Sequence, residues 1–157
     1  MNIFLPEKSI LESVKDLDDR RLNKQIIECQ QIMEVAIGRS SGYKNHPVVK
    51  YYVDYPLFVG WYGMTCVVEY LTRFNKFHKC FDYFFQDYWE YVHYKEIPHF
   101  YCEGPISDPN HIRTTKNTVE LFRNKLCKKW SSDKYAPKWT NREVPQWYKE
   151  YLNGNKK

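Results

Sequence analysis

The sequence lacks the features that mark several large classes of protein. No uncharged apolar run reaches the roughly 20 residues that a membrane-spanning helix needs, because prolines, glycines and Glu69 interrupt the longest candidate, residues 55–71. The N-terminal stretch MNIFLPEKS holds only a short apolar patch, which Pro6 breaks and charged residues follow. We therefore expect no secretory signal, no membrane partner and a cytoplasmic protein.

Motifs for bound cofactors and metals are also missing. The chain contains no P-loop, no GxGxxG fingerprint and no HExxH sequence, which removes common nucleotide-binding and metalloprotease classes. Its five cysteines are odd in number and no two have CxxC spacing, so we predict reduced thiols. His99 and Cys102 form a single HxxC pair, a weak zinc signal. We expect neither a metal nor another cofactor, and enzymes whose nucleophile is an amine stay open.

What the chain does contain is typical of a globular protein rich in aromatic residues. Of its 157 residues, 43% are hydrophobic, 27% are charged and 18% are aromatic. That length fits one compact domain, which we place at residues 1–152, followed by a frayed tail at 153–157. Most rings should fill the core, while exposed ones could stack on bases. The net charge of +5 permits a polyanionic partner without requiring one.

Hydrophobic periodicity predicts an all-α fold of about four to six helices, since few segments alternate with period two. The first predicted helix covers residues 9–16, with Ser9 and Glu12 as a capping box, and the second covers 18–37, capped by Asp18 or Asp19 and stopped by Gly38. A third is capped by Asn45 with Pro47 in its first turn, and a fourth restarts at Pro56 after a cap at Asp54. Two more are predicted over 82–93 and 114–130.

The remaining segments are predicted to be irregular. Loops are expected over 38–47 and 95–113. The C-terminal stretch should be mostly extended, with one helical turn after Pro145. Its aromatic residues Trp139, Trp147 and Tyr148 should pack back on the body.

The segment LDDRRLNKQIIECQQI carries an unusual polar face. Arg21, Lys24, Gln25, Glu28 and Gln31 fall together at helical spacing, with one carboxylate among basic and amide groups. The plainest interpretation is a solvated face on which Lys24 and Glu28 form an i,i+4 pair that stabilises the helix by ~0.3 kcal/mol.

A functional interpretation of the same face involves a nucleic acid. Arg20, Arg21 and Lys24 would neutralise backbone phosphates, while Gln25 and Gln31 could bond bases or sugars. A carboxylate that faces a polyanion is electrostatically unfavourable, so it would need a chemical role. It could stabilise a developing cation or move a proton.

This helix and a second segment resemble a known family. LDDRRLNKQIIECQQI is close to the motif L-D-D-R-R-L-x-K-Q-x-x-E-x-x-Q-I, and GYKNHPVVKYY is similar to G-W-x-N-H-P-A-V. The segment from His111 to Asn117 and the ending KWTNREVPQWY match more weakly. On these motifs the chain resembles the pyrimidine-dimer DNA glycosylase family, of the phage endonuclease V type, and is nearer to its bacterial and phage branch.

The resemblance spans most of the chain and implies a base-excision DNA repair enzyme. The implied protein is all-α, metal-free and monomeric. It acts on double-stranded DNA in the cytosol of a bacterium or a phage-infected host. Its implied activity is that of a DNA glycosylase with associated abasic-site (AP) lyase activity on damaged or modified pyrimidines.

The resemblance also implies roles for the first residues and for one glutamate. In the family, the α-amine of the first residue attacks C1′, the base leaves, a Schiff base forms and β-elimination cuts the strand on the 3′ side. The essential carboxylate of the family falls on Glu28. The amine is that of Met1 if the initiator is kept, as the bulky Asn2 favours, and that of Asn2 otherwise.

General chemistry explains why such an enzyme uses a terminal amine. Only a neutral amine is a nucleophile, and the reference pKa is about 7.7–8.0 for an α-amine but about 10.4 for lysine. Near pH 7.5, roughly a quarter of α-amines but only about 0.1% of lysines are neutral.

Other residues in the matched segments have two interpretations. Asn45 and His46 could line the same site, or serve as a helix cap and a loop histidine. Three more, His111, Lys116 and Asn117, could contact phosphate or base, or simply begin a helix. The phage prototype has arginines at the positions of Ile27 and Gln31, so the resemblance does not determine which DNA lesion is recognised.

Three alternatives to the lyase stay open at this point. One is a non-catalytic nucleic-acid-binding protein on the same fold. Another is a monofunctional glycosylase in which Glu28 activates water. The third is a small metal-binding module that uses His99, Cys102 and another pair.

Overall fold

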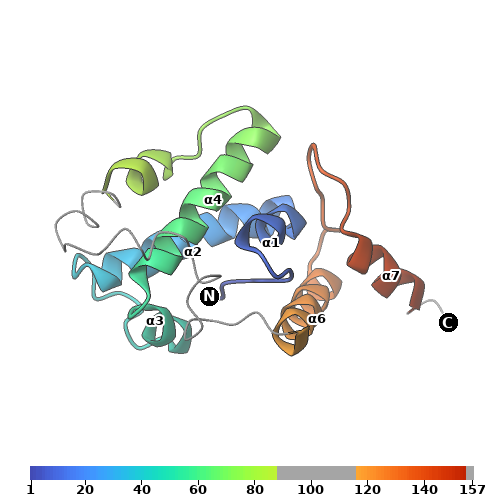
Figure 1. Ribbon diagram of the computed structural model, residues 1–157, viewed down its shortest axis with the longest axis horizontal. Coiled ribbons are helices and arrows are strands. Elements are labelled where there is room, and N and C mark those ends of the chain that lie inside the picture. Colours follow the sequence, from blue (N-terminus) through green and yellow to red (C-terminus); the bar gives the residue numbers. More distant parts are fainter. Residues whose placement is uncertain (88–115, 155–157) are drawn as a thin grey trace.

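The chain is known from a computed structural model that describes residues 1–87 and 116–154. In these ranges every regular element is a helix (Figure 1). The elements are α1 (Ile10–Asp16), α2 (Asp19–Ala36), α3 (Pro47–Tyr52), α4 (Pro56–Phe74), the π-helix η1 (Tyr83–Asp87), α6 (Lys116–Ser132) and α7 (Gln146–Gly154). The predicted all-α fold is confirmed.

The two longest helices, α2 and α4, pack against each other at the centre of the molecule. The apolar side of α2 that the periodicity predicted is buried, with Leu22, Ile26 and Cys29 fully inaccessible to solvent. On α4, Gly63 allows the ring of Phe84 in η1 to lie against the helix backbone, because any Cβ at this position would overlap that ring. The burial of these apolar faces is the main stabilising term of the fold.

The helix starts show which capping predictions hold. Ser9 caps α1 as predicted, and its Oγ accepts a hydrogen bond from the Glu12 N–H at 3.1 Å. Asp18 occupies the N-cap position of α2, but its carboxylate makes no cap hydrogen bond. It accepts instead from the indole of Trp130 at 2.7 Å. The carboxylate therefore joins α2 to α6.

Two predicted caps are wrong. His46, not Asn45, caps α3, since its Nδ1 accepts from the Val48 N–H at 3.1 Å. Asp54 was predicted to cap α4, but the N-cap is Tyr55, which makes no side-chain cap bond. The fixed φ of proline starts both helices, so neither start depends on a conventional capping residue.

The C-terminal stretch is more helical than the sequence indicated. One turn was expected after Pro145, but α7 runs for 9 residues and includes Asn153 and Gly154, which were assigned to a frayed tail. Tertiary packing explains the difference. The Trp147 ring stacks on the Trp130 ring with centroids 5.6 Å apart, and the Tyr148 ring meets the Trp130 ring edge-on at 4.6 Å. The packing of this tail on the body is confirmed.

Two other predictions fall partly or wholly outside the described residues. Of the helix expected over 82–93, the described part is a π-helix, and residues 88–93 lie outside. The loop expected over 95–113 also lies outside, as do residues 155–157.

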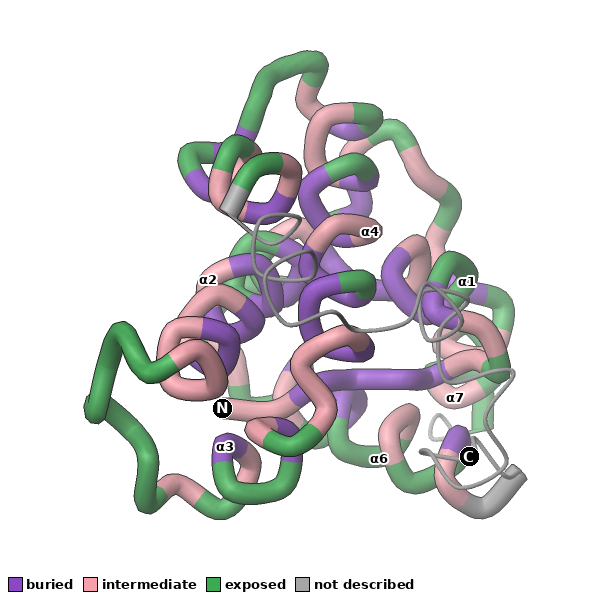
Figure 2. Tube along the Cα trace, turned by 60° about the vertical axis from the view of Figure 1, so that its left-hand side comes forward, coloured by how far each residue is buried: buried purple, intermediate pink, exposed green. Residues whose placement is uncertain are grey.

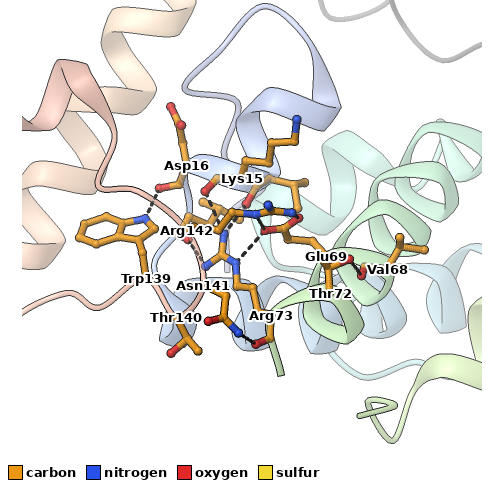
Figure 3. A network of polar contacts seen from close by, with 12 residues as sticks. Lys15, Asp16, Val68, Glu69, Thr72, Arg73, Trp139, Thr140, Asn141 and Arg142 are labelled. Carbon is orange, nitrogen blue, oxygen red and sulfur yellow. Dashed lines mark hydrogen bonds and ion pairs between the residues drawn. The ribbon is translucent and has the colours of Figure 1, made fainter. Parts of the chain in front are cut away.

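A buried polar network fastens the C-terminal stretch to the helical body (Figure 3). Arg73 of α4 is 1% exposed and pairs with Glu69 at 2.8 Å and Asp19 at 3.2 Å. Arg142 pairs with the same Glu69 at 2.7 Å, and Asn141 donates to the Arg73 carbonyl. Removal of a single member would leave a buried charge without its partner.

The N-terminal residues thread through the middle of this assembly. Ile3, Phe4 and Leu5 are 1–2% exposed and run as an extended segment between the helices (Figure 2). The chain terminus therefore lies against the helices, with Met1 and Asn2 only partly exposed. None of the described helices is long and apolar enough to cross a membrane.

Candidate active site

The extended N-terminal segment is held in place by two polar side chains from the central helices. Gln25 of α2 accepts a hydrogen bond from the Phe4 N–H at 3.1 Å, and the Tyr62 hydroxyl of α4 donates to the Phe4 carbonyl at 2.8 Å. Tyr62 also donates to Gln25 at 3.2 Å. Burial raises the pKa of Tyr62 well above its ordinary value, so its hydroxyl stays a donor.

The segment ends with the terminal amine beside a carboxylate. The Met1 nitrogen lies 3.5 Å from Glu28 Oε1. The other oxygen, Oε2, accepts from the Asn2 N–H at 3.1 Å and from the Gln25 amide at 2.9 Å. Three donors from the chain itself therefore fix the direction of this carboxylate.

The Lys24–Glu28 pair of the plain interpretation is present, but its carboxylate is buried and not solvated. The Glu28 side chain is 7% exposed, whereas that of Lys24 is 58% exposed. The lysine lies at the rim of the site and approaches the carboxylate at 3.8 Å. A carboxylate that is buried but held by the terminal amine and by N–H groups is expected where a site must stabilise positive charge.

Gln25 is also buried, at 1% exposure. Its Nε2 donates to the Asn2 carbonyl at 2.6 Å as well as to Glu28, while its Oε1 accepts from Phe4 and Tyr62. Both donors and both acceptor positions of the amide are thus engaged inside the protein. This geometry favours a positioning role over the direct DNA contact that the sequence predicted.

The basic residues at the start of α2 have an acidic partner. Arg21 is 8% exposed and its guanidinium lies 2.7 Å from Asp133, while Arg20 approaches the same carboxylate at 3.6 Å. The Arg20 side chain is still 53% exposed. Of the two arginines, Arg20 has the geometry to meet a phosphate.

An open pocket of about 490 Å³ adjoins the amine and the carboxylate. Two residues predicted for the site, Gln31 and His46, line it together with Lys24. Asn45 is exposed in the preceding turn and is not among its lining residues. The full lining is Met1, Asn23, Lys24, Ile27, Glu28, Gln31, Tyr43 and His46.

The pocket belongs to the part of the chain that a family comparison matches. The sequence profile of the family described as pyrimidine dimer DNA glycosylase matches residues 1–94, which include every residue that lines the pocket. The chain belongs to this family. It is therefore a DNA glycosylase, an enzyme whose substrate is DNA. Comparisons with curated proteins and with solved structures gave no significant match.

Several residues of the glycosylase near the Met1 amine and Glu28 were not predicted from its sequence to belong to the site. Asn23, Ile27 and Tyr43 line the main pocket. Lys129 of α6 joins a small cleft with Met1, Asn2, Phe4, Arg21, Lys24 and Glu28. Tyr43 lies within the matched motif GYKNHP, which was a usable signal. No sequence signal pointed to Lys129, because its position near Met1 and Glu28 depends on how α6 packs against the N-terminal segment.

Some predicted contacts of the glycosylase fall where the structure gives no side-chain information. His111 lies outside the described residues. Lys116 and Asn117 begin α6, but their side chains are not described. Among the described residues, no three His, Cys, Asp or Glu side chains are grouped as metal ligands would be, and Cys29, Cys66, Cys80 and Cys127 are free thiols.

One segment of the glycosylase matches a motif of a different enzyme class. Residues 38–42 read GRSSG, the G-x-S-x-G spacing of serine hydrolases. That motif needs a sharp strand-to-helix turn that exposes its serine. Here the segment follows the C-terminus of α2, and the Ser40 hydroxyl accepts from the Gly42 N–H at 3.1 Å. The match is therefore not a hydrolase site.

Proposed function

We propose that this glycosylase also cleaves the strand at the resulting abasic site, through a Schiff base between the sugar and the Met1 α-amine. The observation that carries the proposal is the 3.5 Å approach of that amine to the buried Glu28, at the edge of an open pocket. The substrate is double-stranded DNA with a damaged pyrimidine, and the protein acts as a monomer without a metal.

The proposed reaction begins with attack of the neutral amine on C1′ of the damaged nucleotide. The new C–N bond replaces the glycosidic bond, and the base leaves with the bonding electron pair and takes up a proton. The C1′–O4′ bond then opens, O4′ gains a proton and a positively charged iminium forms at C1′. Covalent capture of this kind divides one difficult step into two easier ones.

Strand cleavage follows from the acidity that the iminium gives to C2′. A base removes a C2′ proton, the electrons form a carbon–carbon double bond and the 3′ phosphate leaves as an anion. Water finally hydrolyses the imine and frees the amine. No step needs an oxidant, a reductant or a metal.

Glu28 is suited to two roles in this sequence. Its negative charge stabilises the developing positive charge at the sugar and the iminium. Its Oε1, on the side of the amine, is placed to exchange protons with the nucleophile and then with C2′. Gln25 and the Asn2 N–H hold Oε2, so the carboxylate keeps one oxygen fixed while the other acts.

The DNA backbone would lie across the rim of the pocket. In this proposal the exposed Arg20 and Lys24 meet phosphates there together with Lys129, while Gln31 and His46, which line the pocket, meet the nucleotide. Asn45, His111, Lys116 and Asn117 are proposed to extend this contact along the strand. Phosphate contacts of this type make binding salt-dependent.

Selective modification of the terminal amine tests the proposal. Dimethylation keeps the positive charge and the ion pair with Glu28, but a tertiary amine cannot form an iminium. The dimethylated protein should still bind DNA that contains an abasic site and should cut it no faster than background. The matched control is protein whose exposed lysines are dimethylated but whose α-amine is left unmodified and free to react. Full cutting by the α-dimethylated protein would reject the Met1 amine as the nucleophile, because another group would then have to open the abasic site.

A further inference from the structure

The pocket contains one large aromatic side chain that the proposed chemistry does not use. Tyr43 is 60% exposed, yet it lines the pocket beside Met1 and Glu28. Within residues 1–87 and 116–154, its ring has no contact with another ring or with a cation. An exposed ring is ordinary by itself, so its position and its backbone must carry the argument.

The backbone at Tyr43 is unusual for an aromatic residue. Its φ is 60°, in the left-handed region that large side chains rarely adopt. In the described ranges, the other non-glycine residues with positive φ are Asn75 and Asn141, and asparagine tolerates this conformation much better than tyrosine does. A strained residue of this kind persists where the fold requires it or where function uses it.

Backbone hydrogen bonds close the turn around Tyr43. The Tyr43 carbonyl accepts from the His46 N–H at 2.8 Å, immediately before α3, and the Lys44 N–H donates to Ser41 at 3.5 Å. A residue that strains the turn and gains no burial does not stabilise the fold. Asparagine or glycine would suit the turn better, so the ring itself is the feature to explain.

Beside the charged groups, part of the pocket wall suits a flat, uncharged ligand. Ile27 supplies an apolar surface, and Asn23 and Gln31 supply amides. One lysine, Lys24, lines the pocket, and its ammonium group lies close to the Glu28 carboxylate. A pocket of about 490 Å³ is large enough for a nucleotide. An aromatic face combined with amides and an apolar wall recognises a nucleobase, whereas a phosphate would call for cations.

We infer that Tyr43 stacks on a nucleobase that leaves the helical stack at the lesion, and so acts as a positioning residue for base-containing DNA. The inference rests on the proposed function, because it uses the same pocket. The base could come from the damaged strand or from the opposite strand. Enzymes that act on a nucleotide in duplex DNA commonly unstack a base in this way.

Equilibrium binding by three variants tests the inference without any chemistry. Tyr43→Asn removes the ring and suits the backbone, while Tyr43→Phe keeps the ring. Tyr135→Asn is the matched control, since Tyr135 is 63% exposed and does not line the pocket. The melting temperature of Tyr43→Asn should equal or exceed that of the unchanged protein, because strain is relieved.

Three duplexes separate the possible sources of the base. The first carries a pyrimidine dimer, the second a tetrahydrofuran abasic analogue opposite adenine, and the third the same analogue opposite a second one. The analogue has no aldehyde, so binding does not depend on the amine. A failed amine mechanism would leave these binding results interpretable.

The expected result is a loss of affinity for Tyr43→Asn of about 5- to 150-fold, the range for a base stacked on an aromatic side chain. Tyr43→Phe and Tyr135→Asn should bind as the unchanged protein does. Loss with the first duplex alone supports a base from the damaged strand, and loss with the first two supports the opposite base. Equal loss with all three, or no loss with any, would overturn the inference.

Discussion

At the scale of single residues, the central feature is a buried carboxylate that the chain's own N-terminus helps to hold. Glu28 is held by the Met1 amine, the Asn2 N–H and the Gln25 amide. In the usual helix-surface pair a carboxylate faces water and one lysine. Here the two residues that begin the chain take the place of the solvent, so folding and assembly of the site are the same event.

Glu28→Gln tests the chemical role of the carboxylate. Glutamine keeps the size of the side chain and an oxygen for the Asn2 N–H, but it loses the negative charge. We expect the single-turnover cutting rate on abasic DNA to fall by about 10²–10⁴-fold. Affinity should be equal or higher, because a negative charge that faces phosphates is gone.

Glu34→Gln is the control for this change, because Glu34 lies on the same helix outside the pocket and pairs with Arg39. It should cut at the normal rate. A Glu28→Gln protein that cut within a few-fold of normal would remove Glu28 from the chemistry.

Gln25→Met tests the positioning role of the buried amide. Methionine fills a similar volume but leaves the Phe4 N–H and the Asn2 carbonyl without their partner. Since an unpaired buried polar group costs about 1–3 kcal/mol, we expect the free energy of unfolding to fall by roughly 2 kcal/mol or more. The cutting rate should fall while the KM for DNA stays near normal, because the amide does not reach the substrate.

Gln146→Met on α7 is the surface control, since Gln146 is exposed and bonds only Glu150. Urea unfolding and steady-state kinetics measure both effects. A Gln25→Met protein that changed KM alone would indicate direct DNA contact, as the sequence first suggested.

At the scale of elements, the helices could be read from the sequence more reliably than the site. The 3.6-residue pattern of α2 and the Ser9 cap of α1 are local features, so both were predicted and both are present, although the Glu12 side chain of the predicted capping box bonds Lys15 instead. The caps predicted at Asn45 and Asp54 failed because a proline begins each helix one residue later than expected, so that His46 caps α3 and Tyr55 takes the N-cap position of α4. The length of α7 depends on stacking against Trp130, a contact between distant segments that no local pattern shows.

The same division applies to the candidate site. The importance of Glu28 could be inferred from an isolated carboxylate on a basic, amide-rich helix face and from the family motif. Its burial could not, because that depends on where the N-terminal segment threads. Lys129 and the docking of Tyr62 on Gln25 likewise arise from tertiary contacts between elements far apart in the sequence.

Arg73→Met tests how the buried polar network holds α1 and α2 against α4. Arg73 donates to the carbonyls of Val14, Lys15 and Leu17 as well as to Glu69. Truncation of one member of a buried ion pair typically costs about 3–5 kcal/mol, so we expect a loss of that size in the free energy of unfolding.

Lys15→Met is the matched control, because its pair with Glu12 lies at the surface, and it should change stability by no more than ~0.5 kcal/mol. Equilibrium unfolding in urea gives both values. Equal, small losses for the two variants would show that the Arg73 contacts in Figure 3 do not stabilise the packing of these helices.

At the scale of the whole molecule, the stability of the fold should respond to pH through Asp16. Burial raises the pKa of Asp16 to about 6, although the hydrogen bond from the Trp147 indole opposes the shift and the charge of Glu7 adds to it. Because its ordinary value is 3.8, the folded chain holds this proton more tightly than the unfolded chain does. The contribution to stability is therefore greatest below about pH 4 and is lost as the pH rises to about 6.

Asp16→Asn isolates this effect, because asparagine stays neutral and can still accept the Trp147 bond. We expect the variant to match the unchanged protein near pH 4 and to be more stable at pH 7. Urea unfolding at four pH values between 4 and 7, followed by tryptophan fluorescence, measures the difference. A difference that does not change with pH, or one of opposite sign, would contradict the assigned cause.

The most direct test of the account is borohydride trapping on duplex DNA that contains an abasic site. The untagged protein is mixed with this DNA, borohydride is added, and the covalent adduct is digested and mapped by mass spectrometry. The account predicts an adduct on the α-amine of the first residue, and a much weaker one for Glu28→Gln. An adduct on a lysine such as Lys24 or Lys129, or no adduct while the DNA is bound, would contradict it.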